Sequence, residues 1–453
     1  MPAIDKLTRY AQTLTYDDLP SQAVIDVKTH ILDCIGAILA GTMAEGSKKL
    51  IALVKEWSGK PEGTIFSYGL KVPLHEAAWV NSVMCRGFDF EPLLSGGATH
   101  VSASIIPAAF ALCEYSKYIN RSPVKGKNLI TAIALGNDLN WRFRVAGRQS
   151  TTMSGGWLAE TFAPPAIAAL GGNLLGFDQN KIAHTMGIAY GQCSGSYGST
   201  VGEGGGFMAQ LSQGLGTKAG VLSVLLVENG FTAYKDIIDG LWGIYTMYGN
   251  GDYDPEILMG DLGTRFESLS PGIKRYPGCG ATQFPVYGAL ELATQYQIDS
   301  KDIAEIQLRV GDTPYGLCGE NKFDPITSAD ALWNYRYSIA VALTKGKLFV
   351  DNFTEEAIQD RTVLEFIPKI DVTPDPGLKR GIEIEIILQN GRIYKNSINE
   401  MESVSDSELI EKFEKCNRFS VKPLPDEDVE AFLQMINHLE ETDDVTEIID
   451  ILG

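Results

Sequence analysis

The chain has 453 residues, of which 44% are apolar and 21% charged, and its 57 acidic and 38 basic side chains give a formal net charge of −19. A chain of this length exceeds what one compact core usually holds, so two domains are expected. A surface this acidic repels polyanions, which makes nucleic acid and anionic membranes poor partners but does not exclude a small anionic substrate.

The cysteines and the N-terminal residues indicate a cytoplasmic protein. The seven cysteines are scattered and odd in number, and no CxxC pair occurs, so reduced thiols are expected and a metal cluster of the usual spacing is not. Residues 1–14, MPAIDKLTRYAQTL, lack the continuous apolar region of a signal peptide. No segment approaches the roughly 18 consecutive apolar residues that a membrane-spanning helix needs.

Helical periodicity dominates the chain before about residue 265. Between Pro20 and Gly41 apolar residues recur at three- and four-residue steps, which predicts a helix. Its small residues, in DCIGAILAG, favour close packing against other helices. Similar periodic stretches predict helices over 74–87, 103–117, 127–147, 160–175, 180–194 and 208–228.

A two-residue alternation typical of half-buried strands appears later. It covers Ile306 to Val310 and then Ile382 to Ile386, and Asn390-Gly391 supplies the residues that a type I′ hairpin turn requires. Helical patterns lie between these strands and return in the tail, near 282–296, near 329–345 and from about Asp406.

These patterns predict a mainly α fold with an inserted α+β domain. A large all-helical domain is expected to comprise residues 1–265 and the C-terminal return, 401–453. A smaller α+β lid domain is expected over 266–400.

The segment RGFDFEPLLSGGATHVSASIIPAA, residues 86–109, places acidic side chains and a histidine between two predicted helices. Asp89 and Glu91 are two residues apart, and a glycine-bearing loop leads to Thr99-His100. His100 could exchange protons near neutral pH, and Asp89 could orient it or bind a hydroxyl group. The alternative is that Asp89 caps a helix and His100 is an ordinary loop histidine.

The segment SPGIKRYPGCGATQFPVYGALEL, residues 270–292, combines cations with a helix start. Lys274 and Arg275 precede a Pro277-Gly278 turn and a predicted helix, an arrangement suited to binding a carboxylate. Cys279 could be a reactive thiol at that terminus. The alternative is a surface turn with solvated charges.

Two further features favour less specific interpretations. The glycine-rich segment 194–218 contains no phosphate-binding or dinucleotide-binding motif, and it is interpreted as a flexible loop beside a cleft. The basic cluster Arg142, Arg144 and Arg148 is interpreted as a partly solvated helix face in preference to an anion site. His30, His75, His184 and His438 have no partners at metal-ligand spacing, so structural roles are expected for all four.

Several motifs resemble those of the MmgE/PrpD family. DCIGAILAGT at 33–42 is similar to the family's first buried helix. Asn81, followed eight residues later by Asp89, resembles the N-G-x-x-x-H-x-x-D-[FY]-[DE] pattern, and Thr99-His100 lies where the family has [TS]-H-P-S.

The resemblance continues in order along the chain. GNDLNWR at 136–142 is similar to G-Y-E-x-x-x-R, and KRYPGCGATQ at 274–283 is similar to K-x-[YF]-P-x-C-x-x-T-[HQ]. DALWNYRYSIAVAL, from Asp330, resembles D-A-Q-F-S-x-x-Y-A-x-A-x-x-L. Six motifs in register over some 300 residues are specific although each alone is not.

The family includes 2-methylcitrate dehydratases, cis-aconitate decarboxylases and iminodisuccinate epimerases. The resemblance therefore implies a helical domain with an α+β lid, a homodimer, no metal and no cofactor, and a carboxylate substrate held between the domains. The shared chemistry is removal or delivery of a proton at a carbon beside a carboxylate, which needs a base and cations.

The resemblance also assigns roles to residues. His100 would transfer the proton, Asp89 would orient His100 or hold substrate, and Lys274 would bind carboxylate and stabilise charge. The substrate-binding candidates are Thr99, Tyr276, Cys279 and Arg86.

The sequence departs from the family pattern at four places. Arg86 stands where the family usually has a histidine before Asp89, and Leu158 lies about where a second catalytic histidine is expected. Gln210 and Leu211 occupy the stretch where decarboxylases and some dehydratases carry a lysine, and Cys279 stands where decarboxylases tend to have histidine.

Three functions follow from this pattern. The first is a lyase acting on a di- or tricarboxylate, with chemistry like that of 2-methylcitrate dehydratase. The second is an epimerase or isomerase working through the same carbanion, favoured by the missing second histidine. The third is a non-catalytic homologue that binds a carboxylate or other chains.

Overall fold

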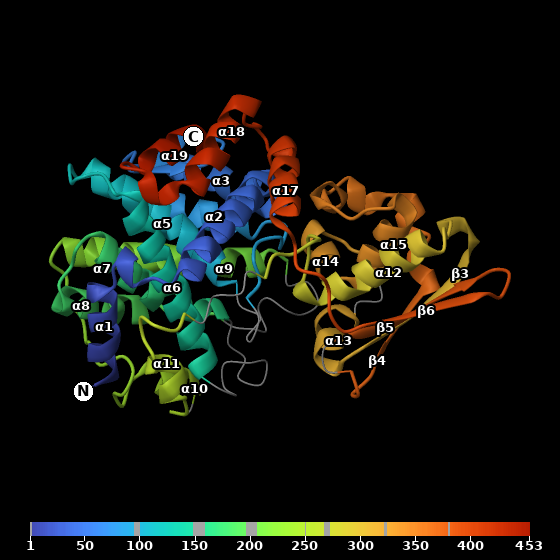
Figure 1. Cartoon of the computed structure of the whole chain (residues 1–453), viewed down its shortest axis with the longest axis horizontal. Helices are drawn as coiled ribbons and strands as arrows, with labels where there is room; N and C mark the ends of the chain where they lie inside the picture. The colour runs from blue at the N-terminus through green and yellow to red at the C-terminus, as the bar shows by residue number, and fades with distance from the viewer. Residues whose placement is uncertain are drawn as a thin grey trace.

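The structure is a computed structural model, and it describes residues 2–94, 100–147, 159–195, 206–249, 251–266, 272–320, 324–378 and 381–453. It consists of a mostly helical large domain and a domain in which helices pack on a mixed four-stranded sheet (Figure 1). The predicted fold class, a helical domain with an α+β lid, is therefore confirmed.

Four helices form the centre of the helical domain: α2 (Ser21–Gly41), α4 (Leu74–Cys85), α5 (Val101–Tyr118) and α9 (Met208–Glu228). Their small residues allow the backbones to approach closely, as the DCIGAILAG pattern predicts for α2. A Cβ atom on Gly41 would lie 1.8 Å from the carbonyl oxygen of Met84 at the end of α4, so only glycine fits there. These contacts fix the ends of α2 and α4, from which the candidate site begins.

The remaining elements of the helical domain surround this centre. The predicted helices are present as α6 (Gly126–Ala146), α7 (Ala163–Leu174) and α8 (Gln179–Tyr190). Elements that the sequence analysis did not predict are α1 (Ala3–Thr13), α3 (Glu45–Trp57), α10 (Ile244–Gly249), α11 (Pro255–Met259) and an antiparallel hairpin of β1 (Gly63–Ile65) and β2 (Leu70–Val72). Within the described residues no helix is long and apolar enough to span a membrane.

The sheet of the lid domain has the strand order β4-β3-β5-β6. β3 (Ile303–Val310) pairs in parallel with β4 (Ile370–Pro374) and antiparallel with β5 (Ile382–Leu388), which pairs antiparallel with β6 (Ile393–Ile398). Alternate residues of β3 and β5 are buried, as their sequence alternation predicts. The buried face packs against α12 (Gln283–Gln295) and α15 (Tyr335–Lys345) (Figure 1).

Two local predictions in the lid domain are wrong in detail. The hairpin at Asn390-Gly391 forms, but of these two residues only Gly391 has a positive φ, +83°, whereas a type I′ turn needs positive φ at both. The helix predicted near 329–345 is broken into α14 (Ser328–Leu332) and α15, because the Asn334 side chain caps α15 by accepting the N–H of Tyr337 at 3.1 Å.

The chain returns to the helical domain after β6. α17 (Asp406–Phe419) packs against α2 at the junction of the two domains, and α18 (Asp426–Asn437) and α19 (Thr446–Leu452) follow it (Figure 1). The lid also contains the short helices α13 (Asp312–Cys318) and α16 (Arg361–Leu364). The segment that enters the lid domain lies next to α17, where Arg275 pairs with Glu408 at 2.6 Å.

Candidate active site

The first part of the site is the loop that follows α4. Asp89 has a φ of +50°, a left-handed conformation that turns the backbone between Arg86 and Glu91. Strain of this kind in a non-glycine residue often accompanies a functional site. The loop then reaches His100, which precedes the first turn of α5. Thr99, a predicted substrate-binding residue, lies outside the described residues.

Arg86 joins the two carboxylates of this loop. Its Nη1 contacts Oδ1 of Asp89 and lies 3.0 Å from Oε1 of Glu91, and all three side chains are buried. Burial alone would raise the pKa of Glu91, but the charges of Arg86 and then His100 outweigh it and hold this pKa below its ordinary value. The pKa of Asp89 is lowered in the same way, by Arg86 and then Lys274 against the effect of burial. Both groups are therefore carboxylates at neutral pH.

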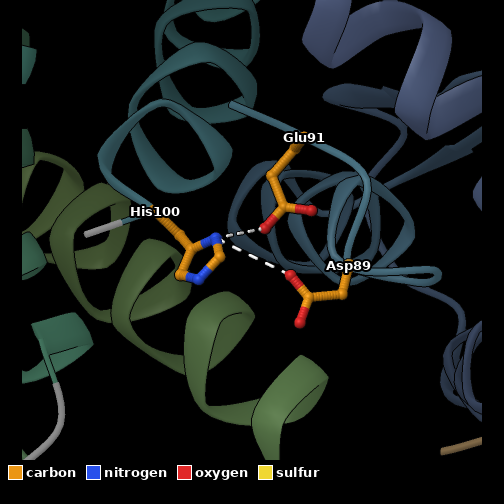
Figure 2. Close-up of side chains that lie close together, drawn as sticks. All are labelled: Asp89, Glu91 and His100. Carbon is orange, nitrogen blue, oxygen red and sulfur yellow. Dashed lines mark ion pairs between the residues drawn. The ribbon is translucent and has the colours of Figure 1, made fainter. Parts of the chain in front are cut away.

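His100 lies against Glu91 (Figure 2). Its Nδ1 is 2.6 Å from Oε1 of Glu91 and 4.0 Å from Oδ1 of Asp89, and the other ring nitrogen faces away from Glu91. A carboxylate on one ring nitrogen fixes the orientation and tautomer of a histidine, leaving the second nitrogen for proton transfer. By these distances Glu91, which was not among the predicted catalytic residues, is the closer partner of His100.

Lys274 extends from the lid domain into the same cluster. Its Nζ contacts Oδ1 of Asp89 and donates to the carbonyl oxygens of Asp89 at 2.6 Å and Gly278 at 3.2 Å. The residue is 3% exposed. An ammonium group has three N–H donors, so the protein already supplies an acceptor for each. A substrate carboxylate would have to replace one of these acceptors or lie in the field of the charge.

Cys279 and Tyr276 lie on the lid side of the cluster. Cys279 is buried at the start of the short 3₁₀ turn Gly280–Thr282 that leads into α12. A hydrogen bond from the thiol of Cys318 lowers the pKa of the Cys279 thiol, against the effect of burial. Tyr276 is half-buried, and it lines a groove of about 580 Å³ between α17 and the lid domain.

Helix α9 supports the loop from the opposite side. The side chain of Gln210 donates to the carbonyl oxygen of Gly87 at 2.8 Å, and that of Gln213 donates to the carbonyl oxygen of His100 at 3.0 Å. Thus, where decarboxylases and some dehydratases of the family carry a lysine, this chain contacts the loop through the side-chain amides of Gln210 and Gln213. Leu158, the other departure from the family pattern, lies outside the described residues.

Asp89, Glu91 and His100 bring three atoms of metal-ligand type within 4.8 Å of one another. However, Arg86 contacts both carboxylates and Lys274 contacts Asp89. A divalent cation there would be close to two positive charges and would compete with both for the same oxygens. Arg86 and Lys274 therefore already pair with the oxygens that a metal ion would need.

Other predicted candidates lie away from the cluster. Arg142, interpreted as part of a solvated face, is instead fully buried and ion-paired with Asp138 at 2.8 Å, and it donates to the carbonyl oxygens of Ile257, Gly260 and Arg265. For Arg142 the solvated interpretation is wrong, because helix periodicity does not show which face the later loops of the chain will cover; Arg144 is partly exposed, and Arg148 lies outside the described residues. His30 is buried beside Ser102 at 3.1 Å, and burial lowers its pKa to about 4, which fits a structural role.

The chain matches two protein-family domains. Residues 5–256 match the MmgE/PrpD N-terminal domain and residues 276–441 match the MmgE/PrpD C-terminal domain. The C-terminal match includes α17, although this helix packs against α2 of the helical domain.

Curated relatives of low identity support the same assignment. Cis-aconitate decarboxylase of Aspergillus terreus is 24% identical over 365 residues, covering 77% of this chain and 73% of that protein. The cis-aconitate decarboxylase-like protein oryM of Aspergillus oryzae is 22% identical over 475 residues, covering 99% of this chain and 96% of that protein. The domain matches cover both halves of the chain, which therefore belongs to the MmgE/PrpD family.

Proposed function

We propose that the protein is a lyase that acts on a small di- or tricarboxylate by moving a proton at a carbon beside a carboxylate, without a metal or an organic cofactor. The observation that carries the proposal is the contact of 2.6 Å between His100 and Glu91, in a buried cluster that also contains two cations. A histidine held in this way is a suitable general base or acid near neutral pH.

The residues would act in the following way. The N–H at Nδ1 of His100 points to the Glu91 carboxylate and stays on the ring, so Nε2 keeps its lone pair and removes a proton from the substrate carbon. The electron pair moves into the neighbouring carboxylate, where the charge of Lys274 stabilises it. In a dehydration the pair then forms a C=C bond as the β-hydroxyl group leaves as water, with the proton that His100 has removed. In a decarboxylation carbon dioxide leaves first, and protonated His100 delivers the proton to the carbon.

The names of the relatives suggest which substrates to try first. Because three curated relatives are cis-aconitate decarboxylases or like them, cis-aconitate is the first candidate, and 2-methylcitrate, the substrate expected from the family motifs, is the second. Epimerisation of a dicarboxylate remains a second candidate function. It is favoured by the missing second histidine, since Leu158 stands about where the family carries one.

We further propose a cytoplasmic homodimer. All seven cysteines are described, buried and free, which suits a reducing compartment. Large apolar side chains between residues 231 and 247 of the helical domain are 56–73% exposed, and such a concentration suits contact with a second copy of the chain. They are Phe231, Tyr234, Leu241, Trp242 and Met247.

Proton NMR in D₂O with cis-aconitate, 2-methylcitrate, citrate, malate and aspartate derivatives tests the reaction. We expect deuterium to enter an α- or β-carbon of one compound, with new or lost vinyl signals for a lyase and unchanged vinyl signals for an epimerase. His100→Gln should abolish the exchange, because glutamine cannot take up the proton. Exchange at the wild-type rate in this variant would remove His100 from the mechanism, and no exchange with any compound would favour a non-catalytic carboxylate-binding homologue.

A further inference from the structure

Lys412 is a buried cation outside the cluster described above. It lies in the middle of α17, on the helix that returns from the lid domain, and it is 8% exposed. Its Nζ is 2.6 Å from Oδ1 of Asp33, a fully buried carboxylate on α2. It also lies 3.7 Å from the centre of the Phe90 ring.

The other two contacts of Lys412 reach both halves of the candidate site. Nζ donates to the carbonyl oxygen of Phe90 at 2.8 Å and to the carbonyl oxygen of Lys274 at 3.1 Å. These two carbonyl oxygens accept two of the three N–H groups of the ammonium, and Asp33 supplies the opposite charge. Phe90 lies between Asp89 and Glu91, so one carbonyl belongs to the helical-domain loop and the other to the lid segment.

Backbone hydrogen bonds between the same two segments surround this contact. The N–H of Leu93 donates to the carbonyl oxygen of Gly272 at 2.8 Å, and the N–H of Gly278 donates to that of Phe88 at 3.0 Å. Lys412 thus binds both segments between the two backbone hydrogen bonds that join them.

A buried ion pair adds little net stability, because removing both charges from water costs free energy. Burial raises the pKa of Asp33, and Lys412 opposes this shift without reversing it, so the desolvation of the pair is only partly offset. Apolar side chains of similar size would fill the same space, but they could not bind two carbonyl groups. The Lys412–Asp33 pair is therefore better explained by the two carbonyl groups that Lys412 binds than by its contribution to stability.

We propose that Lys412 is a positioning residue for the reaction: anchored by Asp33, it fixes the Asp89–Glu91 loop relative to Lys274. This inference rests on the proposed function, because it assigns a purpose to the alignment of those groups. A displacement of about 1 Å between reacting groups and their supports is enough to cost a large factor in rate.

The test compares Lys412→Met with Lys415→Met. Lys415 is on the same helix, its side chain is 49% exposed, and it pairs with Glu411 at 2.7 Å. For Lys412→Met we expect a loss in kcat of about tenfold or more, with a smaller change in KM, because alignment is lost while the cations that attract substrate remain. We also expect faster amide hydrogen exchange in residues 86–94 and 272–280. Lys415→Met should keep the wild-type values of all three quantities.

Wild-type kcat in a folded Lys412→Met protein would overturn the proposal, and so would slower turnover without faster exchange in the two segments. If Lys412→Met does not fold, Lys412→Arg is tested instead. Its guanidinium keeps a positive charge near Asp33 but cannot donate to both carbonyl oxygens in the same way. Wild-type kcat and wild-type amide exchange in Lys412→Arg would then count against a positioning role. If the wild-type protein itself transfers no proton with any carboxylate, the proposed function fails, and the exchange comparison still shows whether Lys412 holds the segments together.

Discussion

At the scale of single residues, the site is a set of opposed charges removed from water. Arg86 and Lys274 face Asp89 and Glu91, so the two cations balance the two carboxylates before any substrate binds. The charge that changes during the proposed reaction is that of His100, which Glu91 contacts directly. Glu91 would then stabilise the imidazolium form while Asp89 keeps Lys274 in place.

Replacement of Glu91 by glutamine tests this division of roles. Glutamine keeps the size and can still accept a hydrogen bond from Nδ1, but it does not stabilise a positive imidazolium. We expect kcat to fall by about 10²- to 10⁴-fold with little change in KM, the range expected when a catalytic histidine loses the carboxylate that orients it. Steady-state kinetics with the substrate identified by NMR measures both constants.

Glu114→Gln is the matched control for this variant. Glu114 lies on α5, the helix that follows His100, and it bonds Thr64 at 2.6–2.8 Å, in the helical domain's small hairpin. Its substitution should leave kcat unchanged. Equal losses of kcat in Glu91→Gln and Glu114→Gln would mean that Glu91 supports the folded structure around α5 and has no specific role toward His100.

At the scale of elements, the position of the site loop depends on how closely α2 and α4 approach. Gly36 and Gly41 are both in α2 and look alike in sequence, but their surroundings differ. A Cβ on Gly36 would meet its nearest neighbour, Phe413, at 3.4 Å, an ordinary contact, whereas a Cβ on Gly41 would overlap the backbone of Met84. Only the second glycine is required by packing.

The two alanine variants should therefore differ in stability. Gly41→Ala is expected to lower the free energy of unfolding by about 3 kcal/mol or more, because a backbone carbonyl must move. Gly36→Ala should change it by no more than about 1 kcal/mol, since alanine favours the helix and fits the space. Chemical denaturation followed by circular dichroism gives both values. Similar values for the two variants would show that α2 can shift away from α4 at little cost.

At the scale of the whole molecule, the site needs both domains and the returning helix. The loop with Asp89, Glu91 and His100 belongs to the helical domain, Lys274 and Cys279 come from the lid side, and α17 lies at the junction (Figure 1). Opening of the lid would separate Lys274 from Asp89. In the proposed mechanism, proton transfer would therefore depend on the contact between the domains.

The proposed dimer makes a prediction at the same scale. The double substitution Leu241→Glu/Trp242→Glu places charges on the side chains that are 73% and 66% exposed, and a buried charge without a partner strongly disfavours an interface. We expect light scattering after size-exclusion chromatography to give a dimer for the wild type and a monomer for this variant. Ile326→Glu, on a lid side chain that is 84% exposed, should stay dimeric. A wild-type monomer would disprove the homodimer, and an unchanged dimer in the double variant would place its interface elsewhere.

Much of the fold follows from the sequence, because helix and strand periodicities depend on local spacing. The helix Ser21–Gly41 has the predicted bounds, and the alternation in Ile382–Leu388 correctly predicts a half-buried strand. The helix and the strand require only that residues at short separations keep their usual geometry. The motif order also identifies the family, and the resemblance groups Asp89, His100 and Lys274 as site residues.

What the tertiary structure alone decides is which groups touch. Asp89 and Glu91 are two residues apart and equally acidic, and only the left-handed turn at Asp89 places Glu91 against Nδ1 of His100. Likewise, an amphipathic helix such as α17 gives no sign that Lys412 faces Asp33 rather than water. These contacts join residues up to 379 positions apart, and their geometry depends on the packing of whole domains, which no local pattern records.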